Sequence, residues 1–154
     1  MSDVFLKVVG VILAILLLLV APALIIGMVQ DLTIQRSAMN STENFLDVAR
    51  NSGRITANDY TDFVSDLHAL GVTFDVHIVV EQEVIYPTEV RRVVVASMRS
   101  TQDVSGVFPV ICRKGDFVTV SVVQTSRSSG QRFAANTLRT QGEFRFSLSG
   151  AVRN

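Results

Sequence analysis

Apolar residues dominate the N-terminal part of the chain, and the run from Val8 to Val29 contains no charged or strongly polar side chain. The run covers about 22 residues, and at about 1.5 Å per residue a helix of that length spans the roughly 30 Å hydrocarbon core of a bilayer. The pattern therefore predicts a transmembrane helix over residues 1–29.

After Val29 the chain becomes polar, but no helix-breaking residue occurs before Gly53. Apolar or small side chains recur here at the spacing of one helix face. These positions are Leu32, Met39, Thr42, Phe45, Leu46 and Ala49. We therefore expect the membrane helix to continue as an amphipathic stalk over residues 30–53. A single helix would then run from about Val4 to Asn51 and stop at Gly53.

A second helix is expected to begin at Thr56, whose hydroxyl can act as the N-cap. Asp59 then places a negative charge in the first turn, where the helix dipole favours it. Gly71 is the predicted end of this helix. Its expected apolar face consists of Tyr60, Phe63, Val64, Leu67 and Leu70.

Alternation of apolar and polar side chains predicts β-strands in three later segments. These segments are residues 72–80, 117–125 and 143–152. The tripeptide Val84-Ile85-Tyr86 either lengthens the first strand or pairs back on it. Lys114-Gly115-Asp116 marks a turn before the second strand.

Two segments are harder to assign from the pattern. In residues 88–100 three consecutive valines favour a strand, but a helical face behind a Thr88 cap is also present, and we favour a helix. The members of that face are Val90, Val93, Val94 and Met98. Residues 131–140 are expected to form a short helix closed by Gly142. Its inward side chains would be Phe133, Thr137 and Leu138.

Together these elements predict an α+β fold, in which a long N-terminal helix packs on a small antiparallel-sheet head over residues 54–154.

Two interpretations of the N-terminus compete. Lys7 and the small residues Ala21-Pro22-Ala23 would suit a cleaved signal peptide, but such peptides have an apolar core of only roughly 7–15 residues. The run continues past that site, so we favour a retained anchor. Lys7 before the helix weakly favours a cytoplasmic N-terminus and an extracytoplasmic head.

Charge and cysteine content narrow the classes of function. The chain has 154 residues with 14 basic and 14 acidic side chains, so bulk charge gives no support for nucleic-acid binding. The single cysteine, Cys112, cannot form an internal disulfide. Because it lies in an apolar stretch, we expect a buried thiol.

Few residues suggest catalytic chemistry. His68 and His77 are the two histidines, and neither occurs in an HExxH pattern or near a cysteine pair. Asp62 and Asp66 are spaced to share a helix face near His68, so a carboxylate–imidazole dyad is conceivable, although a charged outer face is the commoner explanation. The sequence has neither a glycine-rich phosphate loop followed by lysine nor a Gly-x-Ser-x-Gly motif. We therefore expect neither an enzyme nor a cofactor or metal site.

Four short motifs stand out along the chain after the apolar run: Val48 to Thr56, Asp59 to Val76, Lys114 to Val120 and Ser149 to Val152. They resemble motifs of small TadE-like, pilin-like membrane proteins of Gram-positive bacteria. The resemblance implies a pilin-like fold and a role as a minor pilin or pseudopilin of a type IV-like or tight-adherence pilus or secretion machine. One feature departs from the family, because no glutamate interrupts the apolar run as it does in processed prepilins.

The resemblance also implies the partners: other pilin-like subunits, membrane lipid, and the platform proteins of a pilus or secretion machine. The protein would then reside in the cell membrane as a single-pass subunit and could enter an extracellular filament. A membrane-tethered binding or sensor module is the alternative from another class. An anchored hydrolase acting through Asp62, Asp66 or His68 is a third hypothesis.

Small residues in the apolar run offer positions where two helices can approach closely. Pro22 removes one helical hydrogen bond and is expected to bend the helix, which membrane helices tolerate. A lone anchor can also contain such small residues. The candidate residues for helix packing and assembly are Gly10, Ala14, Leu17, Ala21, Pro22 and Gly27.

Overall fold

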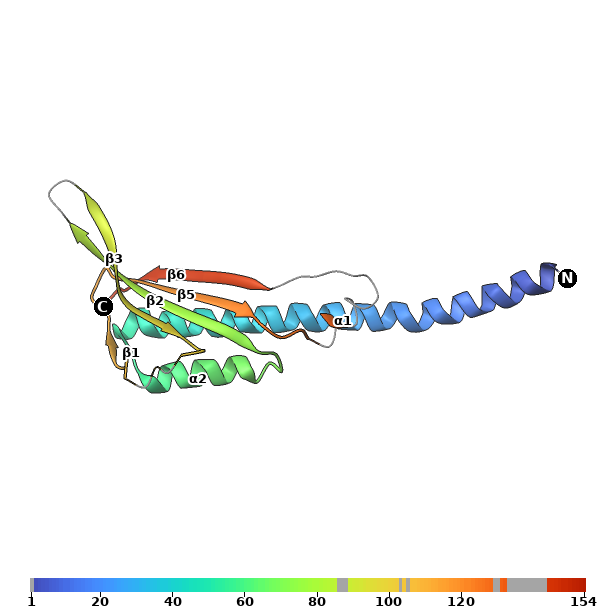
Figure 1. Cartoon of the computed structure of the whole chain (residues 1–154), viewed down its shortest axis with the longest axis horizontal. Helices are drawn as coiled ribbons and strands as arrows, with labels where there is room; N and C mark the ends of the chain where they lie inside the picture. Colours follow the sequence, from blue (N-terminus) through green and yellow to red (C-terminus); the bar gives the residue numbers. More distant parts are fainter. Residues whose placement is uncertain (1, 86–88, 103, 105, 129–130, 133–143) are drawn as a thin grey trace. The chain divides into compact units, whose positions relative to one another are not determined.

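The computed structural model describes residues 2–85, 89–102, 104, 106–128, 131–132 and 144–154. The chain divides into two compact units. The first unit comprises Met1–Thr33 and Arg127–Gly142, and the second comprises Ile34–Ser126 and Glu143–Asn154. Helix α1 (Ser2–Ser52) contributes to both units (Figure 1).

The expected continuous N-terminal helix is confirmed, because α1 extends from Ser2 to Ser52 with Pro22 inside it. It ends where Gly53 adopts a φ of 66°, a left-handed conformation that favours glycine. The Gly53 amide donates a hydrogen bond to the Ala49 carbonyl at 3.1 Å. A side chain at this position would also crowd the Cys112 carbonyl, 3.3 Å from an ideal Cβ.

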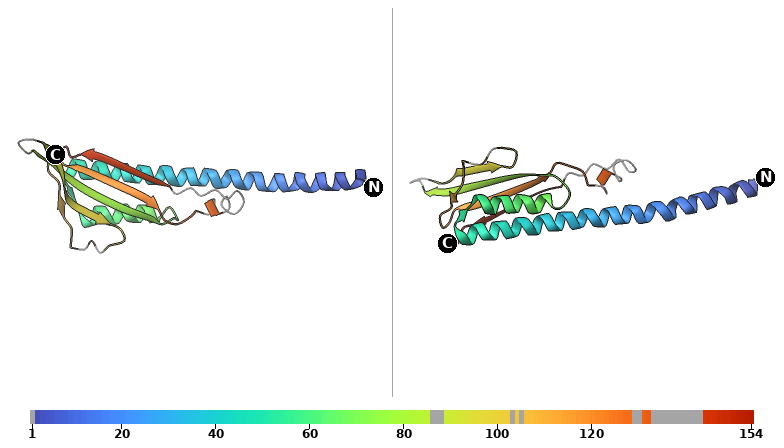
Figure 2. Two further views of the ribbon diagram at one scale, coloured as in Figure 1. Left: turned by 45° about the horizontal axis from the view of Figure 1, so that its top comes forward. Right: turned by 90° about the horizontal axis from the view of Figure 1, so that it is seen from below.

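The second unit is a four-stranded antiparallel sheet with helices on one face, as Figures 1 and 2 show. The strand order is β3-β2-β5-β6. The strands are β2 (Phe74–Ile85), β3 (Val90–Arg99), β5 (Phe117–Gln124) and β6 (Arg145–Ala151). Helix α2 (Ala57–His68) and the part of α1 that belongs to this unit cover the same face. This arrangement confirms the expected long helix with a small antiparallel sheet.

Alternation along the central strands creates the core. The side chains of β2 and β5 that face the helices are buried, and they meet across the sheet in register, as in Val76 opposite Val122 and Ile78 opposite Val120. The intervening side chains lie on the other face. The strands predicted at residues 72–80, 117–125 and 143–152 are confirmed as β2, β5 and β6, although β2 begins at Phe74 and continues to Ile85, and residue 143 lies outside the described residues.

The helix favoured for residues 88–100 is wrong, because Val90–Arg99 forms strand β3. It pairs with β2 from His77–Arg99 to Ile85–Val90, with a register shift next to Val80. Only Met98 of the proposed helical face is buried. The valines thus gain no packing on the core, and the backbone hydrogen bonds offered by the edge of β2 decide the conformation.

The capping prediction for the second helix is confirmed. The Asp59 amide donates to Thr56 Oγ1 at 3.2 Å, and the Thr56 amide donates to Asp59 Oδ2 at 3.0 Å. This capping box satisfies two backbone donors that the first turn of a helix leaves free. Helix α2 ends at His68, and Tyr60, Phe63 and Leu67 are buried.

The apolar stripe of α1 differs in part from the expected one. Thr42, Phe45, Leu46 and Ala49 are buried as predicted, but Leu32 and Met39 are 53% and 38% exposed. Ile34 and Ala38 are buried instead. Four-residue steps from Ile34 through Ala38 to Thr42 keep these side chains on one helix face, and Leu32 and Met39 lie off that face.

The far end of α1 is tied to the last strand. Arg50 Nε donates to the Ala151 carbonyl at 2.9 Å, and the Arg153 amide donates to the Arg50 carbonyl at 3.1 Å. The sequence did not predict two short strands nearby, β1 (Arg54–Ile55) and β4 (Val110–Ile111), which pair antiparallel.

In the first unit, Ser128 Oγ donates a hydrogen bond to the Asp31 carboxylate. Ser128 Oγ also accepts from the Gln131 amide at 3.0 Å, and residues 131 and 132 are helical. The remainder of the helix expected over 131–140, with Phe133, Thr137, Leu138 and the terminating Gly142, lies outside the described residues.

Candidate functional site

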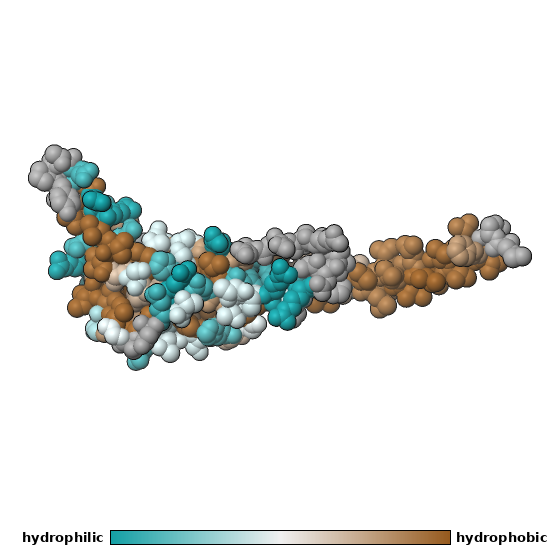
Figure 3. All heavy atoms as spheres, in the orientation of Figure 1, coloured by the Kyte–Doolittle hydropathy of each residue, from teal (hydrophilic) through white to brown (hydrophobic). Residues whose placement is uncertain are grey.

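The N-terminal part of α1 presents apolar side chains all around the helix. Every residue from Val4 to Leu19 is exposed, including Leu17 at 58%. The most apolar 18-residue window has a mean hydropathy of 3.2 and is not buried. Figure 3 shows this apolar surface in brown. Within the described residues, α1 is the helix long and apolar enough to cross a membrane.

Only some of the predicted packing residues share one face of this helix. Gly10, Ala14, Leu17 and Ala21 follow each other at three- and four-residue steps and therefore lie along one stripe. Pro22 and Gly27 fall outside it. A Cβ added at Gly10 would meet no atom within 4 Å, so this stripe has room for close approach by another helix.

The proposed dyad on α2 does not form. Asp62, Asp66 and His68 are all exposed. Asp62 and Asp66 share a face and line a shallow groove beside Val48 of α1. His68 points elsewhere, because two residues turn a helix by about 200°.

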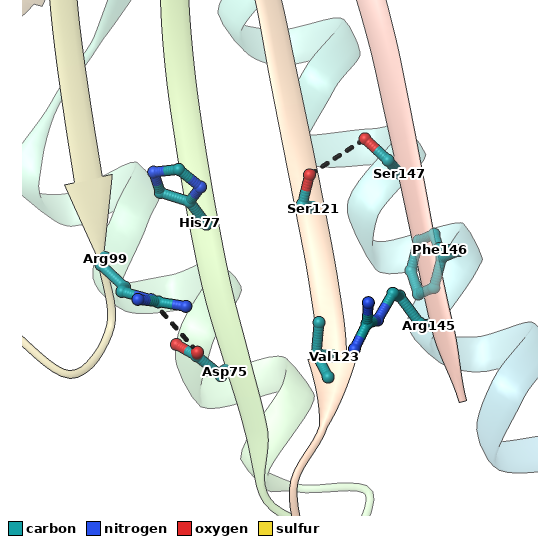
Figure 4. Close-up of a pocket in the computed structure, with 8 residues that line it drawn as sticks. All are labelled: Asp75, His77, Arg99, Ser121, Val123, Arg145, Phe146 and Ser147. Atoms are coloured by element: carbon teal, nitrogen blue, oxygen red, sulfur yellow. Dashed lines mark hydrogen bonds and ion pairs between the residues drawn. The ribbon is translucent and has the colours of Figure 1, made fainter. Parts of the chain in front are cut away.

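A hollow of about 630 Å³ lies on the face of the sheet opposite the helices (Figure 4). Strands β2, β3, β5 and β6 all contribute to it, and its lining combines charged, hydroxyl and apolar side chains. The lining residues are Asp75, His77, Arg99, Ser121, Val123, Arg145, Phe146 and Ser147.

Strand register brings these residues together. His77, Ser121 and Ser147 are opposite one another across β2, β5 and β6, with Arg99 of β3 next to His77. The adjacent row contains Asp75, Val123 and Arg145. Outward side chains recur at every second residue of a strand, so both rows are on the same face.

The carboxylate in the hollow is already engaged. Asp75 Oδ2 lies 3.2 Å from Arg99 Nε, and Ser100 Oγ donates to Asp75 Oδ1 at 3.2 Å. Only 17% of the Asp75 side chain is exposed, compared with 53% for Arg99. Among the described lining residues, Asp75 is the one carboxylate, and Arg99 and Arg145 are the cations.

Hydroxyl groups form a second feature of the site. Ser121 Oγ and Ser147 Oγ are 3.0 Å apart, and His77 Nε2 is 2.9 Å from Ser97 Oγ. No carboxylate of the described chain hydrogen-bonds the His77 ring, since Asp75 is held by Arg99 and Ser100. The serine–histidine pair therefore lacks the third group that orients a catalytic base.

Residue patterns alone did not identify the hollow, because its lining comes from four strands far apart in sequence. The sequence signal that could have indicated it is the set of polar side chains that alternate with apolar ones along each strand. Among residues with described positions, no group of three or more His, Cys, Asp or Glu side chains could hold a metal ion.

Two side chains away from the hollow, Cys112 and Tyr60, have raised pKa values. Burial raises the pKa of the Cys112 thiol to about 11, and the nearby Asp116 carboxylate adds to the effect. The predicted buried thiol is therefore confirmed. Burial, followed by the charge of Asp75, raises the pKa of Tyr60, whose buried hydroxyl has no hydrogen-bond partner among the described residues.

The chain was also compared with known proteins. No model of a protein family matches it, and no curated protein or solved structure matches it. The resemblance to TadE-like, pilin-like proteins therefore stays a prediction from the sequence motifs.

Proposed function

We propose that this chain is a pilin-like, single-pass membrane subunit, a minor pilin or pseudopilin of a type IV-like or tight-adherence pilus or secretion machine. One observation supports the proposal most. A single helix, α1, exposes apolar side chains all around from Val4 to Leu19, and from Ile34 to Ala49 it contributes one buried stripe to the sheet unit.

The exposed part of α1 needs an apolar environment, because each buried CH₂ group is worth about 0.8 kcal/mol. Lipid chains supply that environment for a single subunit. Neighbouring copies supply it in an assembly, since helix–helix contacts can replace contacts with lipid. The stripe from Gly10 to Ala21 is the face through which we expect copies to pack.

The proposed orientation follows the charge pattern. Lys7 precedes the apolar run, which favours a cytoplasmic N-terminus and an exported sheet unit. The proposed partners are other pilin-like subunits, lipid and the platform proteins that assemble them. The proposed location is the cell membrane and, after assembly, an extracellular filament.

A charge at the centre of the apolar run tests the membrane role. In Leu17→Asp the carboxylate disfavours insertion by about 3 kcal/mol, so the equilibrium constant for membrane insertion should fall by about a hundredfold and membrane retention should decrease. Leu32→Asp is the matched control, because Leu32 is similarly exposed on the same helix but lies beyond the run. Membrane fractionation after alkaline extraction measures both. Equal retention of Leu17→Asp and the wild type would overturn the proposal.

Bulk at Gly10 tests assembly separately from anchoring. A leucine there fits the single chain, so Gly10→Leu should stay in the membrane but lose contact with neighbouring copies. Cys112 is buried, so a cysteine introduced at Leu13 gives a specific cross-linking site near the stripe. If the protein cross-links through residue 13 equally well with and without Gly10→Leu, packing through this face is contradicted.

A membrane-tethered binding module is a second candidate, and the hollow on the sheet favours it. Such a module would bind a ligand as a single copy. Full-length protein in lipid nanodiscs that binds ligand and forms no cross-links through residue 13 would favour this candidate over the assembly subunit.

A further inference from the structure

Two surfaces of the sheet unit carry opposite charge. We propose that they form a head-to-tail contact between copies of this chain, in which the basic tip of one copy binds the acidic groove between α1 and α2 of the next. The inference rests on the proposed assembly role, because it names the surfaces through which the sheet units of neighbouring subunits meet.

The basic tip lies where α1 ends, beside β1 and the last residues of the chain (Figure 1). Backbone hydrogen bonds bring its segments together. The Cys112 amide donates to the Gly53 carbonyl at 2.9 Å, and the Gly115 amide donates to the Val152 carbonyl at 3.1 Å. Four basic residues next to these bonds are exposed: Arg54, Arg113, Lys114 and Arg153.

The charge of the tip is not balanced by nearby carboxylates. None of its four basic side chains forms an ion pair with a described residue. Asp116 is close to the tip, but it is buried and accepts a hydrogen bond from the Arg113 amide at 2.7 Å. Asp47 is also close, and it is paired with Arg50 at 3.3 Å. The side chains of the tip therefore retain a net positive charge.

An apolar side chain projects among these cations. Ile111 is opposite Arg54 in the pairing of β4 with β1. It is 72% exposed, the largest value for a large apolar side chain described in the sheet unit. An apolar centre with a charged rim is the usual composition of a surface that binds another protein.

The acidic groove lies between α1 and α2 and has an apolar floor. The stacked rings of Phe45 and Phe63 line it together with Val48, which is 50% exposed. Asp62 and Asp66 on α2 also line it. Both carboxylates are exposed, and neither forms an ion pair with a described residue. No basic side chain is among the described lining residues, so the groove is negative.

The size and charge of the groove suit the tip. The groove measures about 210 Å³, below the roughly 300–1,000 Å³ of pockets for small ligands, and it therefore suits a projecting side chain better. Ile111 would contact the apolar floor while the cations around it approach Asp62 and Asp66. Like charges disfavour contacts of tip with tip and of groove with groove. A contact between two different surfaces repeats from copy to copy, as an extended assembly requires.

Carbodiimide cross-linking of the full-length chain in lipid vesicles tests the contact directly. The reagent joins a lysine amine to a carboxylate that touches it, and Lys7 and Lys114 are the two lysines of the chain. Mass spectrometry of mixed unlabelled and isotope-labelled chains distinguishes amides between copies from amides within one copy. We expect amides between copies from Lys114 to Asp62 or Asp66. Amides from Lys114 only to other carboxylates, or none between copies, would overturn the contact.

Charge reversal on each surface locates the contact. Arg113→Glu and Asp62→Arg should each lower the yield of amides between Lys114 and Asp66 about tenfold, because like charges then meet. A mixture of the two variants should recover the yield, since the unchanged tip of one matches the unchanged groove of the other. Arg91→Glu is the matched control, because Arg91 is exposed on β3 outside both surfaces.

Circular dichroism verifies that each variant is folded. An unchanged yield in both folded variants, an equal loss in the control or no recovery in the mixture would contradict the head-to-tail contact. A cysteine at Leu13 in the same vesicles separates this inference from the proposed assembly role. Cross-links through residue 13 without amides at Lys114 would overturn only the contact between sheet units. Absence of both would contradict the assembly role as well.

Discussion

The two parts of helix α1 have the same backbone conformation but opposite relations to their surroundings. From Val4 to Leu19 every residue is exposed, although nearly all are apolar. From Ile34 to Ala49 the buried side chains form one stripe, and Ala38 and Thr42 in it are fully buried. Helix propensity does not distinguish the two parts. The distribution of apolar residues around the helix decides what each part can pack against.

The buried part has a defined partner in the sheet unit. The Phe45 ring stacks on Phe63 of α2 with centroids 4.6 Å apart and an angle of 17° between the ring planes. Thr42 fits the same stripe because its hydroxyl donates to the Ala38 carbonyl at 2.7 Å and so leaves no polar atom unsatisfied. Stability of the sheet unit should therefore depend on the second part of α1 and not on the first.

Truncation of one large side chain in each part gives the largest expected contrast. Phe45→Ala removes a ring that is 6% exposed, and we expect the free energy of unfolding to fall by about 3–5 kcal/mol. Leu16→Ala removes a side chain that is 57% exposed and should leave that free energy unchanged. Urea unfolding of the full-length protein, followed by circular dichroism because the chain has no tryptophan, measures both. Similar losses of unfolding free energy in the two variants would contradict the proposed difference between the two parts of α1.

Features set by neighbouring residues were predictable from the sequence. The continuous helix, its stop at Gly53 and the Thr56 cap each depend on residues only a few positions apart. Features that depend on distant partners were not. The valines of residues 90–99 fit either a strand or a helix, and pairing with β2 decided between them. The hollow forms only because four strands pair in a particular register. The residues next to Arg99, Ser121 or Arg145 in the sequence do not indicate that pairing.

Thiol reactivity gives a second test of the difference between the two parts of α1, because Cys112 lies where the buried part ends. Its amide donates to the Gly53 carbonyl at 2.9 Å, and its side chain is 5% exposed. A thiol pKa of about 11, against an ordinary 9.0, lowers the reactive thiolate at pH 8 by about a hundredfold. Iodoacetamide should thus label the folded chain at least a hundredfold more slowly than the chain in urea.

The same pKa shift has a defined sign for stability. The unfolded chain loses the Cys112 proton near pH 9.0 and the folded chain near pH 11, so the stability from this group is lost as the pH rises through that window. Leu17→Asp, which changes only the exposed part of α1, should not alter the labelling rate. Fast labelling of that variant would show that the two parts are coupled.

The smallest expected effect concerns α2, which packs on the buried part of α1. Thr56→Ala removes the side-chain acceptor for the Asp59 amide and should lower the free energy of unfolding by about 1 kcal/mol. Thr61→Ala is the matched control, since Thr61 is exposed and its hydroxyl donates to the Ala57 carbonyl within the helix. Alanine there also has the higher helix propensity, so little or no loss is expected. Urea unfolding of both variants would contradict the role of the cap if Thr61→Ala lost as much stability as Thr56→Ala. A loss confined to Thr56→Ala, with membrane retention unchanged, would place the effect of the cap in the sheet unit alone.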